Sequence, residues 1–278
     1  MSTQTTVHGV AEIGFIFRDS ATRLSHLYER HPLRVLFPTP PKGDLPAAVL
    51  VTTSGGFVAG DRIEITVTAG VEAAAHATGS AAEKIYRSTG ATTAIDQRLN
   101  VEAGAWLEFL PPETILFDRA KLRRVTRVDL RGNGGFLGGG IIVFGRIAMG
   151  ERFSEGLLHD RWEVYRDGAL VWGDALHVVD DVAAVMDNPA CFAGAEACGT
   201  LIFAPRDGEP RRFIEAAREA QGATTEGLRA GSTAVNGLLV ARWLGDAMPL
   251  RRAYAELACH LRAAAMGLPP VLPRLWHV

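Results

Sequence analysis

Apolar and polar residues alternate repeatedly between positions 47 and 180, over five to eight positions at a time, with glycine or Asp-Gly and Asn-Gly turns between the runs. In the run 63–67, for example, Ile63, Ile65 and Val67 would face one way, while Glu64 and Thr66 face the other. This period of two is typical of strands with one buried face. The pattern therefore predicts a mainly β fold.

A similar pattern returns at 99–107 and, more loosely, at 128–137, so that the repeats are about 30 to 35 residues apart. Such spacing favours stacked strand–turn–strand units, as in a β-helical ladder. A sandwich-like stack of strands gives the same signal, and both architectures stay open. Asp167 and Gly168 lie between two apolar runs and predict a hairpin.

The C-terminal third differs, because apolar residues recur there at steps of three and four. Residues 210–220 and a stretch containing Leu250, Leu257 and Leu261 predict two helices, with Asp246 as a candidate cap for the second. Residues 232–244 read as a strand that an Asn-Gly pair interrupts. We assign no structure to 181–200, and we expect the proline-rich 268–273 to be extended.

These elements predict a single domain over residues 1–278. Its β-rich core would cover about 20–180, and a mixed α/β part would cover about 200–278. Residues 1–6 have neither the basic nor the apolar region of a secretory signal, and the longest uncharged stretch, 132–145, is too short to cross a bilayer. We therefore expect a cytoplasmic protein that does not enter a membrane.

Composition removes further classes. The chain has 47% hydrophobic and 22% charged residues, an ordinary globular mixture, and its net charge of −2 gives no electrostatic reason to expect nucleic acid as a partner. The three cysteines, Cys191, Cys198 and Cys259, form neither an even disulfide set nor a Cys-x-x-Cys pair. They are expected to be ordinary small buried or half-buried residues.

Residues 52–61 read TTSGGFVAGD, which ends an apolar run with a glycine-rich turn. A phosphate-binding loop would place Lys after the last glycine, whereas Asp61 follows Gly60 here and would repel phosphate. A dinucleotide loop would open a helix, but the following residues alternate with a period of two. A specified β-turn or bulge is the simpler interpretation.

A second glycine-rich stretch, 134–140, would weaken an ordinary strand unless another backbone approaches it closely. Neighbouring strands of the same fold, and a partner or channel wall, both stay open as the reason.

Candidate enzyme chemistry is sparse. Glu108, Glu113 and Asp118 could supply the two carboxylates of a β-sandwich carbohydrate hydrolase, but sequence does not give their separation. No Gly-x-Ser-x-Gly motif is present. The histidines are scattered, and His159 with Asp160 is the closest approach to a ligand pair, so no tight preformed metal site is predicted. They are His8, His26, His31, His76, His159, His177, His260 and His277.

Six segments occur in an order and spacing that resembles the urease accessory protein UreD family, also called UreH. They are the turn 55–61, SAAEKIYRS at 80–88, the stretch 104–118, GERF at 150–153, RWEVYRDG at 161–168 and the closing 269–276. The resemblance runs from about residue 20 to the end. It implies a largely β, ladder-like fold with a few helices, and a scaffold or chaperone in place of a hydrolase.

The resemblance also implies partners and cargo. Such a scaffold would bind apo-urease and, with the helical partner UreF and through it the GTPase UreG, assist nickel insertion into the urease metallocentre. Nickel would pass in transit, and no cofactor would be tightly bound. The C-terminal helix and the tail 272–276 are candidate partner contacts, although Trp276 could equally fold back on its own core.

The resemblance marks motif residues at Gly55, Gly56, Gly60, Asp61, Lys84, Tyr86, Arg87, Glu108, Pro111, Glu113, Asp118, Arg152, Phe153 and Trp162. Among them, Asp61, Glu113 and Asp118 are the candidate weak oxygen ligands along a nickel path. The competing interpretation is structural: Asp61 caps its own turn, and Glu113 and Asp118 pair with Lys84, Arg87 or Arg123. Glu83 departs from the family pattern, which usually has a small polar residue there.

Two further alternatives stay open. One is the carbohydrate hydrolase described above. The other is a structural module without any metal role, for which alanine at Asp61 and Glu113 would leave urease maturation unchanged.

Overall fold

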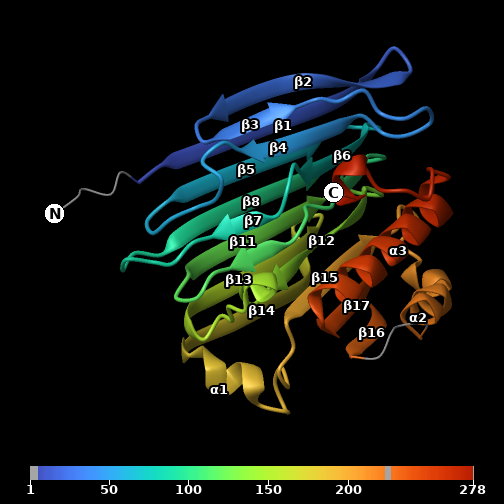
Figure 1. Ribbon diagram of the computed structural model, residues 1–278. Coiled ribbons are helices and arrows are strands. Elements are labelled where there is room, and N and C mark those ends of the chain that lie inside the picture. The colour runs from blue at the N-terminus through green and yellow to red at the C-terminus, as the bar shows by residue number, and fades with distance from the viewer. Residues whose placement is uncertain (1–5, 223–226, 278) are drawn as a thin grey trace.

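Two β-sheets lie face to face along the molecule in the computed structural model, which describes residues 6–222 and 227–277 (Figure 1). The first sheet contains, in spatial order, β14 (Ala169–Asp181), β13 (Glu155–Arg166), β11 (Lys121–Leu130), β8 (Thr93–Val101), β5 (Arg62–Ala69), β1 (His8–Arg18) and β2 (Ala21–Arg30). The second contains β16 (Leu228–Val235), β17 (Leu238–Gly245), β15 (Ala197–Ala204), β12 (Gly135–Val143), β9 (Trp106–Phe109), β6 (Ala74–Gly79), β4 (Ala47–Thr52) and β3 (Leu33–Leu36). The short strands β7 (Glu83–Ile85) and β10 (Thr114–Leu116) pair with each other, and β10 also pairs with β12.

The chain alternates between the two sheets and so forms a β-ladder. From β4 to β13 the longer strands belong alternately to the second and the first sheet, and neighbours within each sheet are parallel. Arg62 pairs with Ala94, Ala94 with Arg123, and Arg123 with His159, so successive partners are 32, 29 and 36 residues apart. The ladder prediction and the mainly β fold class are confirmed.

Alternation along each strand produces the core. In β5 the even, polar positions are partly exposed, whereas Ile63, Ile65 and Val67 are buried between the sheets. Each fully buried side chain of this size contributes roughly 1.5–3 kcal/mol through removal of apolar surface from water. The inter-sheet core continues through Leu99 and Val128 on the next strands of the first sheet.

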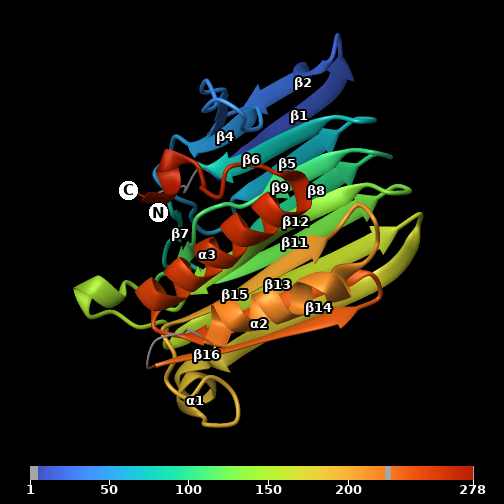
Figure 2. The same ribbon diagram turned by 90° about the vertical axis from the view of Figure 1, so that its right-hand side faces the viewer.

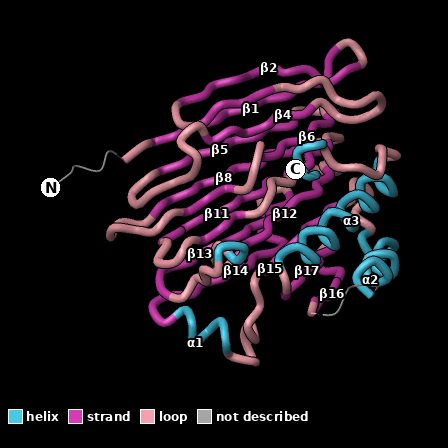
Figure 3. Tube along the Cα trace, in the orientation of Figure 1, coloured by secondary structure: helices cyan, strands magenta, loops and turns pink. Residues whose placement is uncertain are grey.

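The two C-terminal helices cover the outer face of the second sheet, whereas the short α1 (Val182–Asp187) packs against β13 and β14 of the first sheet (Figures 2 and 3). Helix α3 (Ala247–Met266) packs against β15, β12 and β17 through a stripe that includes Leu250, Leu257 and Leu261. Helix α2 (Ile214–Gly222) follows the short η2 (Pro210–Phe213) and lies beside β16 and α3. Both helices are where the periodicity predicts them. Asp246 occupies the N-cap position of α3, but its side chain makes no capping hydrogen bond.

The remaining predicted elements are also located. Asp167 and Gly168 form the turn between β13 and β14, and the stretch 232–244 becomes the hairpin of β16 and β17 with its turn at Asn236. Residues 181–200, left unassigned, form α1 (Val182–Asp187) and enter β15. The short η1 (Ile147–Met149) precedes β13, and η3 (Arg274–His277) ends the otherwise irregular tail. Strands extend from His8 to Gly245, beyond the range of about 20–180.

The glycine-rich segment 134–140 forms most of β12, between β9 and β15. A Cβ atom on Gly139 would lie 1.9 Å from the carbonyl oxygen of Thr200, and one on Gly138 would lie 2.7 Å from that of Phe109. The backbones that approach β12 therefore belong to its two neighbouring strands. Among the described residues, no helix is both long and apolar enough to cross a membrane.

Candidate functional site

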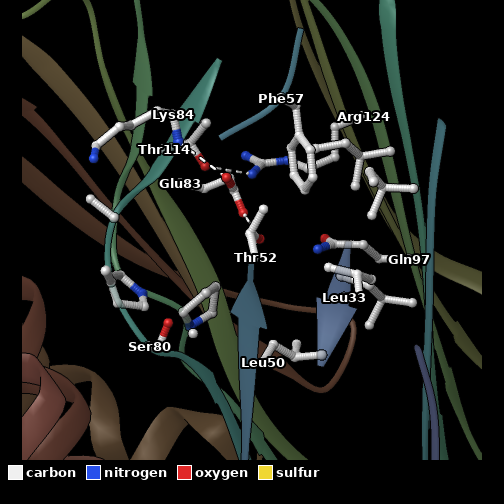
Figure 4. A pocket seen from close by; sticks show the side chains of 18 of the residues that line it. Leu33, Leu50, Thr52, Phe57, Ser80, Glu83, Lys84, Gln97, Thr114 and Arg124 are labelled. Atoms are coloured by element: carbon white, nitrogen blue, oxygen red, sulfur yellow. Dashed lines mark hydrogen bonds between the residues drawn. The ribbon is translucent and has the colours of Figure 1, made fainter. Parts of the chain in front are cut away.

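A cavity of about 150 Å³ lies between the two sheets, near the glycine-rich turn (Figure 4). It gathers several separate sequence segments: the turn at Gly55, strand β7 with Glu83 and Lys84, and the proline pair at Pro111. Apolar side chains of both sheets form much of the wall, and the polar lining includes Thr52, Ser80, Gln97, Thr114 and Arg124. The fold therefore brings together three of the segments on which the family resemblance rests.

Glu83 is the carboxylate of this cavity. One of its carboxyl oxygens, Oε2, accepts a hydrogen bond from the hydroxyl of Thr52 at 2.7 Å. Figure 4 shows the carboxyl group pointing inward, while the ammonium group of Lys84 points away. Burial raises the pKa of Glu83 to about 7, and the bond from Thr52 and the charges of Lys84 and Arg124 only partly offset this. Near neutral pH the carboxyl group of Glu83 is therefore protonated in part of the molecules.

Arg124 also lines the cavity, and its charge acts on the carboxyl group of Glu83 (Figure 4). Its Nε and Nη2 donate to the two oxygens of Asp160 at 2.7 and 2.8 Å, and its Nη1 donates to the hydroxyl of Thr114 at 2.9 Å. Only 6% of Arg124 is exposed, so its charge is buried. The bidentate pair with Asp160 compensates for this burial and holds the guanidinium in one position. In the sequence Arg124 belongs to a basic cluster, but alternation along β11 turns it inward while Arg123 and Arg127 face solvent.

The glycine-rich turn is attached to β7 by backbone hydrogen bonds. The amide of Phe57 donates to the carbonyl of Lys84 at 2.8 Å, and the amide of Tyr86 donates to the carbonyl of Phe57 at 2.9 Å. Gly56 has φ +144°, and a Cβ there would lie 2.7 Å from the carbonyl oxygen of Lys84. Glycine is therefore required where β7 crosses the turn. The turn is a structural device, as the simpler interpretation predicts.

The buried side chain of Asp61 stabilises this turn by accepting backbone hydrogen bonds. It is 2% exposed, and its two oxygens accept the amides of Val7 at 3.0 Å and of Val58 at 2.9 Å. The structure thus gives Asp61 the capping role of the structural interpretation. Its neighbour Gly60 has φ +87°, which completes the turn.

Glu113 and Asp118 have partners other than the predicted Lys84, Arg87 and Arg123. The Oε2 atom of Glu113 lies 3.3 Å from the Nε atom of Arg251 on α3. Asp118 accepts the amide and the hydroxyl of Ser154 at 2.9 and 2.8 Å. Burial would raise the pKa of Asp118, but the bonds from Ser154 and Glu155 outweigh it and lower that pKa. None of Asp61, Glu113 and Asp118 lines the cavity.

Glu108 belongs to a second buried cluster, on the outer side of the second sheet. His76 Nδ1 lies 2.8 Å from Glu108 Oε2, and Arg262 Nε lies 3.1 and 3.2 Å from the two carboxyl oxygens. Burial would raise the pKa of Glu108, but His76 and Arg262 outweigh it and keep that pKa below its usual value. Since Glu108 is fully buried, it does not face a second carboxylate across an open cleft, as a carbohydrate hydrolase would need.

The other motif residues divide into core and surface. Phe153 and Trp162 belong to the inter-sheet core. Tyr86 donates its hydroxyl to the carbonyl of Gly55 at 3.0 Å. Lys84, Arg87 and Arg152 are exposed, and Arg152 pairs with Asp187 at 3.3 Å.

Sequence reasoning missed the roles of Glu83 and Arg124. Glu83 stood out only as a departure from the family pattern, and the alternation of β11 was the signal that turns Arg124 inward. Among the described residues, no group of three or more His, Cys, Asp or Glu side chains is arranged to hold a metal ion.

Comparison with known proteins decides the family. A family model described as the UreD urease accessory protein matches residues 7–277. The chain belongs to the UreD family. A relative named urease accessory protein UreD from Magnetococcus marinus is 43% identical, over 98% of this chain and 94% of its own length. Proteins of the same family from Bradyrhizobium sp. and Azorhizobium caulinodans are 39% and 42% identical over 96% and 92% of this chain.

UreD membership over nearly the whole chain supports a urease accessory role. Of the motif residues, Gly55, Lys84 and Pro111 line the cavity between the sheets. The predicted resemblance is confirmed.

Proposed function

We propose that this UreD chain is a cytoplasmic scaffold that holds immature urease in a nickel-receptive complex and offers the ion a route past Glu83. The single domain would bind the urease subunits and UreF, and reach the GTPase UreG through UreF. Nickel is cargo in transit in this proposal, and no cofactor is tightly bound. The observation that carries the proposal is full-length family membership combined with a cavity between the sheets whose lining is partly polar.

The cavity has the chemistry that transfer of an ion requires. A single carboxylate with hydroxyl and amide neighbours binds a divalent ion weakly, and weak binding permits release. Glu83 can give up its proton near neutral pH when an ion arrives and recover it when the ion leaves. The fixed guanidinium of Arg124 opposes long residence of a cation. Asp61, Glu113 and Asp118 support the surrounding loops, and direct nickel contact by them stays a prediction.

The experiment measures urease activity and urease nickel content in cells that express the urease subunits and the other accessory proteins at limiting nickel. Omission of this chain should abolish both quantities, and the wild type should restore them. Glu83→Gln should lower both several-fold, and Ala82→Leu, which adds three carbons to the cavity lining, should do the same. Glu215→Gln, on the exposed face of α2, is the matched control and should behave as wild type.

Co-purification of the accessory complex separates the two halves of the proposal. If the Glu83 and Ala82 variants assemble normally and still deliver nickel at the wild-type rate, the route past Glu83 is wrong. If omission of the chain leaves activity and nickel content unchanged, the scaffold role is wrong as well.

A further inference from the structure

His159 and His177 meet on the solvent side of the first sheet, on the antiparallel strands β13 and β14. They are direct partners in the strand register, their Nδ1 atoms are 3.3 Å apart, and their ring centroids are 5.3 Å apart. His159 is half-buried and His177 is exposed. The flanking Leu158 and Asp160 turn inward, so the two imidazoles project from the sheet as a pair.

The separation of the two nitrogens suits a shared metal ion. Imidazole nitrogens bind zinc-class ions at about 2.0–2.1 Å, so a 3.3 Å separation corresponds to a nitrogen–metal–nitrogen angle of about 104–111°. That range contains the tetrahedral angle. An octahedral ion, with an angle of about 90° between neighbouring ligands, needs the two Nδ1 atoms only slightly closer together. An ion could therefore bridge the two Nδ1 atoms with little movement of either strand.

The surroundings of His159 favour its neutral form. Burial lowers the pKa of His159, and so do the His177 ring and the cations Arg123 on β11 and Arg161 on β13, against a smaller opposing effect of Asp160. A neutral imidazole has a free lone pair, whereas an imidazolium has none. The same arginines repel a cation, so binding should be weak and rapidly reversible.

We propose that His159 and His177 form a surface site for one divalent ion of the nickel, copper or zinc class, bound through both Nδ1 atoms and completed by water. Imidazole suits these ions better than it suits magnesium or calcium. The site stands independently of the proposed function, because it lies on the opposite face of the first sheet from the cavity. Among the described residues no third protein ligand joins it, which leaves the remaining positions open.

The test follows the histidine ring signals by NMR during titration of the untagged full-length chain with Zn²⁺, and calorimetry with Ni²⁺. In the wild type, the signals of His159 and His177 should shift together, and Mg²⁺ should have no effect. His177→Ala and His159→Ala should each weaken binding at least about tenfold, because each removes one of two ligands. His26→Ala, which removes an exposed histidine paired with Glu12 on the same sheet, is the matched control and should bind as wild type.

Two results would overturn the proposal. One is an unchanged zinc-induced shift of His159 in His177→Ala, because it would mean that each ring binds ions alone. The other is equal calorimetric affinity in the wild type and both variants, which would place the metal elsewhere. Thermal unfolding of each variant checks that the fold is intact, and an exposed His177→Ala change should leave it nearly unaltered.

Discussion

Arg262 donates its Nε to both carboxyl oxygens of Glu108, at 3.1 and 3.2 Å, although 154 positions separate the two residues. The same guanidinium pairs with Asp44 and donates to the carbonyl of Pro269 at 2.8 Å. One cation thus connects the helical layer, the second sheet, a loop and the C-terminal tail. A buried charge at such a junction has consequences that can be measured.

Arg262→Met should lower the free energy of unfolding by about 3–5 kcal/mol, because it leaves Glu108 as a buried charge without its cation. Chemical denaturation measures this. Arg218→Met is the matched control, since Arg218 makes an exposed pair with Glu215 and should cost about 0–1 kcal/mol. A double variant Arg262→Met with Glu108→Gln should recover part of the loss, and no recovery would contradict the charge argument.

The raised pKa of Glu83 should make the free energy of unfolding depend on pH. Its pKa is about 7 in the folded protein, against 4.5 for the free side chain, so the folded state holds a proton that the unfolded chain has released. The free energy of unfolding should therefore fall as pH rises from about 4.5 to 7, by up to about 3 kcal/mol from this group. Glu83→Gln, which cannot ionise, should remove this loss.

Urea unfolding at about pH 5 and pH 8 tests that prediction. The variant should be more stable than the wild type at the higher pH and differ less at the lower one. Glu215→Gln should leave the pH dependence unchanged. An identical pH dependence for wild type and Glu83→Gln would show that the carboxyl group is hydrated and titrates normally.

Two adjacent glycines form a matched pair of sites. Gly55 has φ +74° with open space around its Cβ position, whereas the Cβ position of Gly56 lies 2.7 Å from the Lys84 carbonyl oxygen. Gly55→Ala should cost about 1–2 kcal/mol, the strain of a left-handed alanine. Gly56→Ala should cost more, about 3 kcal/mol or above, because β7 must also move. Thermal unfolding compares them, and equal costs would contradict the close approach.

Trp276 predicts that the tail is part of the fold. It is 4% exposed, its ring stacks on Tyr254 with centroids 5.7 Å apart, and its Nε1 donates to the carbonyl of Leu110 at 3.0 Å. Trp276→Ala should therefore lower the free energy of unfolding by about 3–5 kcal/mol in the isolated chain. The exposed Val271→Ala is the control, with little effect expected. A stable Trp276→Ala chain would instead favour the interface interpretation.

Much of this fold could be predicted because its signals are local. The alternation of Ile63, Ile65 and Val67 fixes which face of β5 is buried, and the Asp-Gly pair after Arg166 selects a tight turn. The regular distance between such runs is a property of a ladder, where each turn adds one strand to each sheet. The family segments are also local, so the order and spacing of six of them indicate the family without any geometry.

The candidate site could be predicted only in part. Gly55, Lys84 and Pro111 line the cavity, but the carboxylate that faces it is Glu83, which the sequence marks only as a difference from the family pattern. The chemistry of Asp61, Glu113 and Asp118 makes them candidate nickel ligands, which stays a prediction, and the structure shows each of them bonded to backbone or paired with a neighbour. Sequence alone does not show where a side chain on a turn points, because backbone dihedrals and neighbouring strands decide that.

By itself, then, the sequence determined the strand periodicity, the helices of the C-terminal third, the hairpin turns and the family. Only the tertiary structure decided which distant residues meet. A regular hairpin with its turn at Asp167 and Gly168 would pair His159 with Leu176. The bulge between Val164 and Tyr165 shifts the register by one residue, so His159 pairs with His177. Arg262 reaches Glu108 only because α3 packs on the second sheet. Local preferences act over a few residues, whereas burial and pairing join segments that the chain keeps far apart.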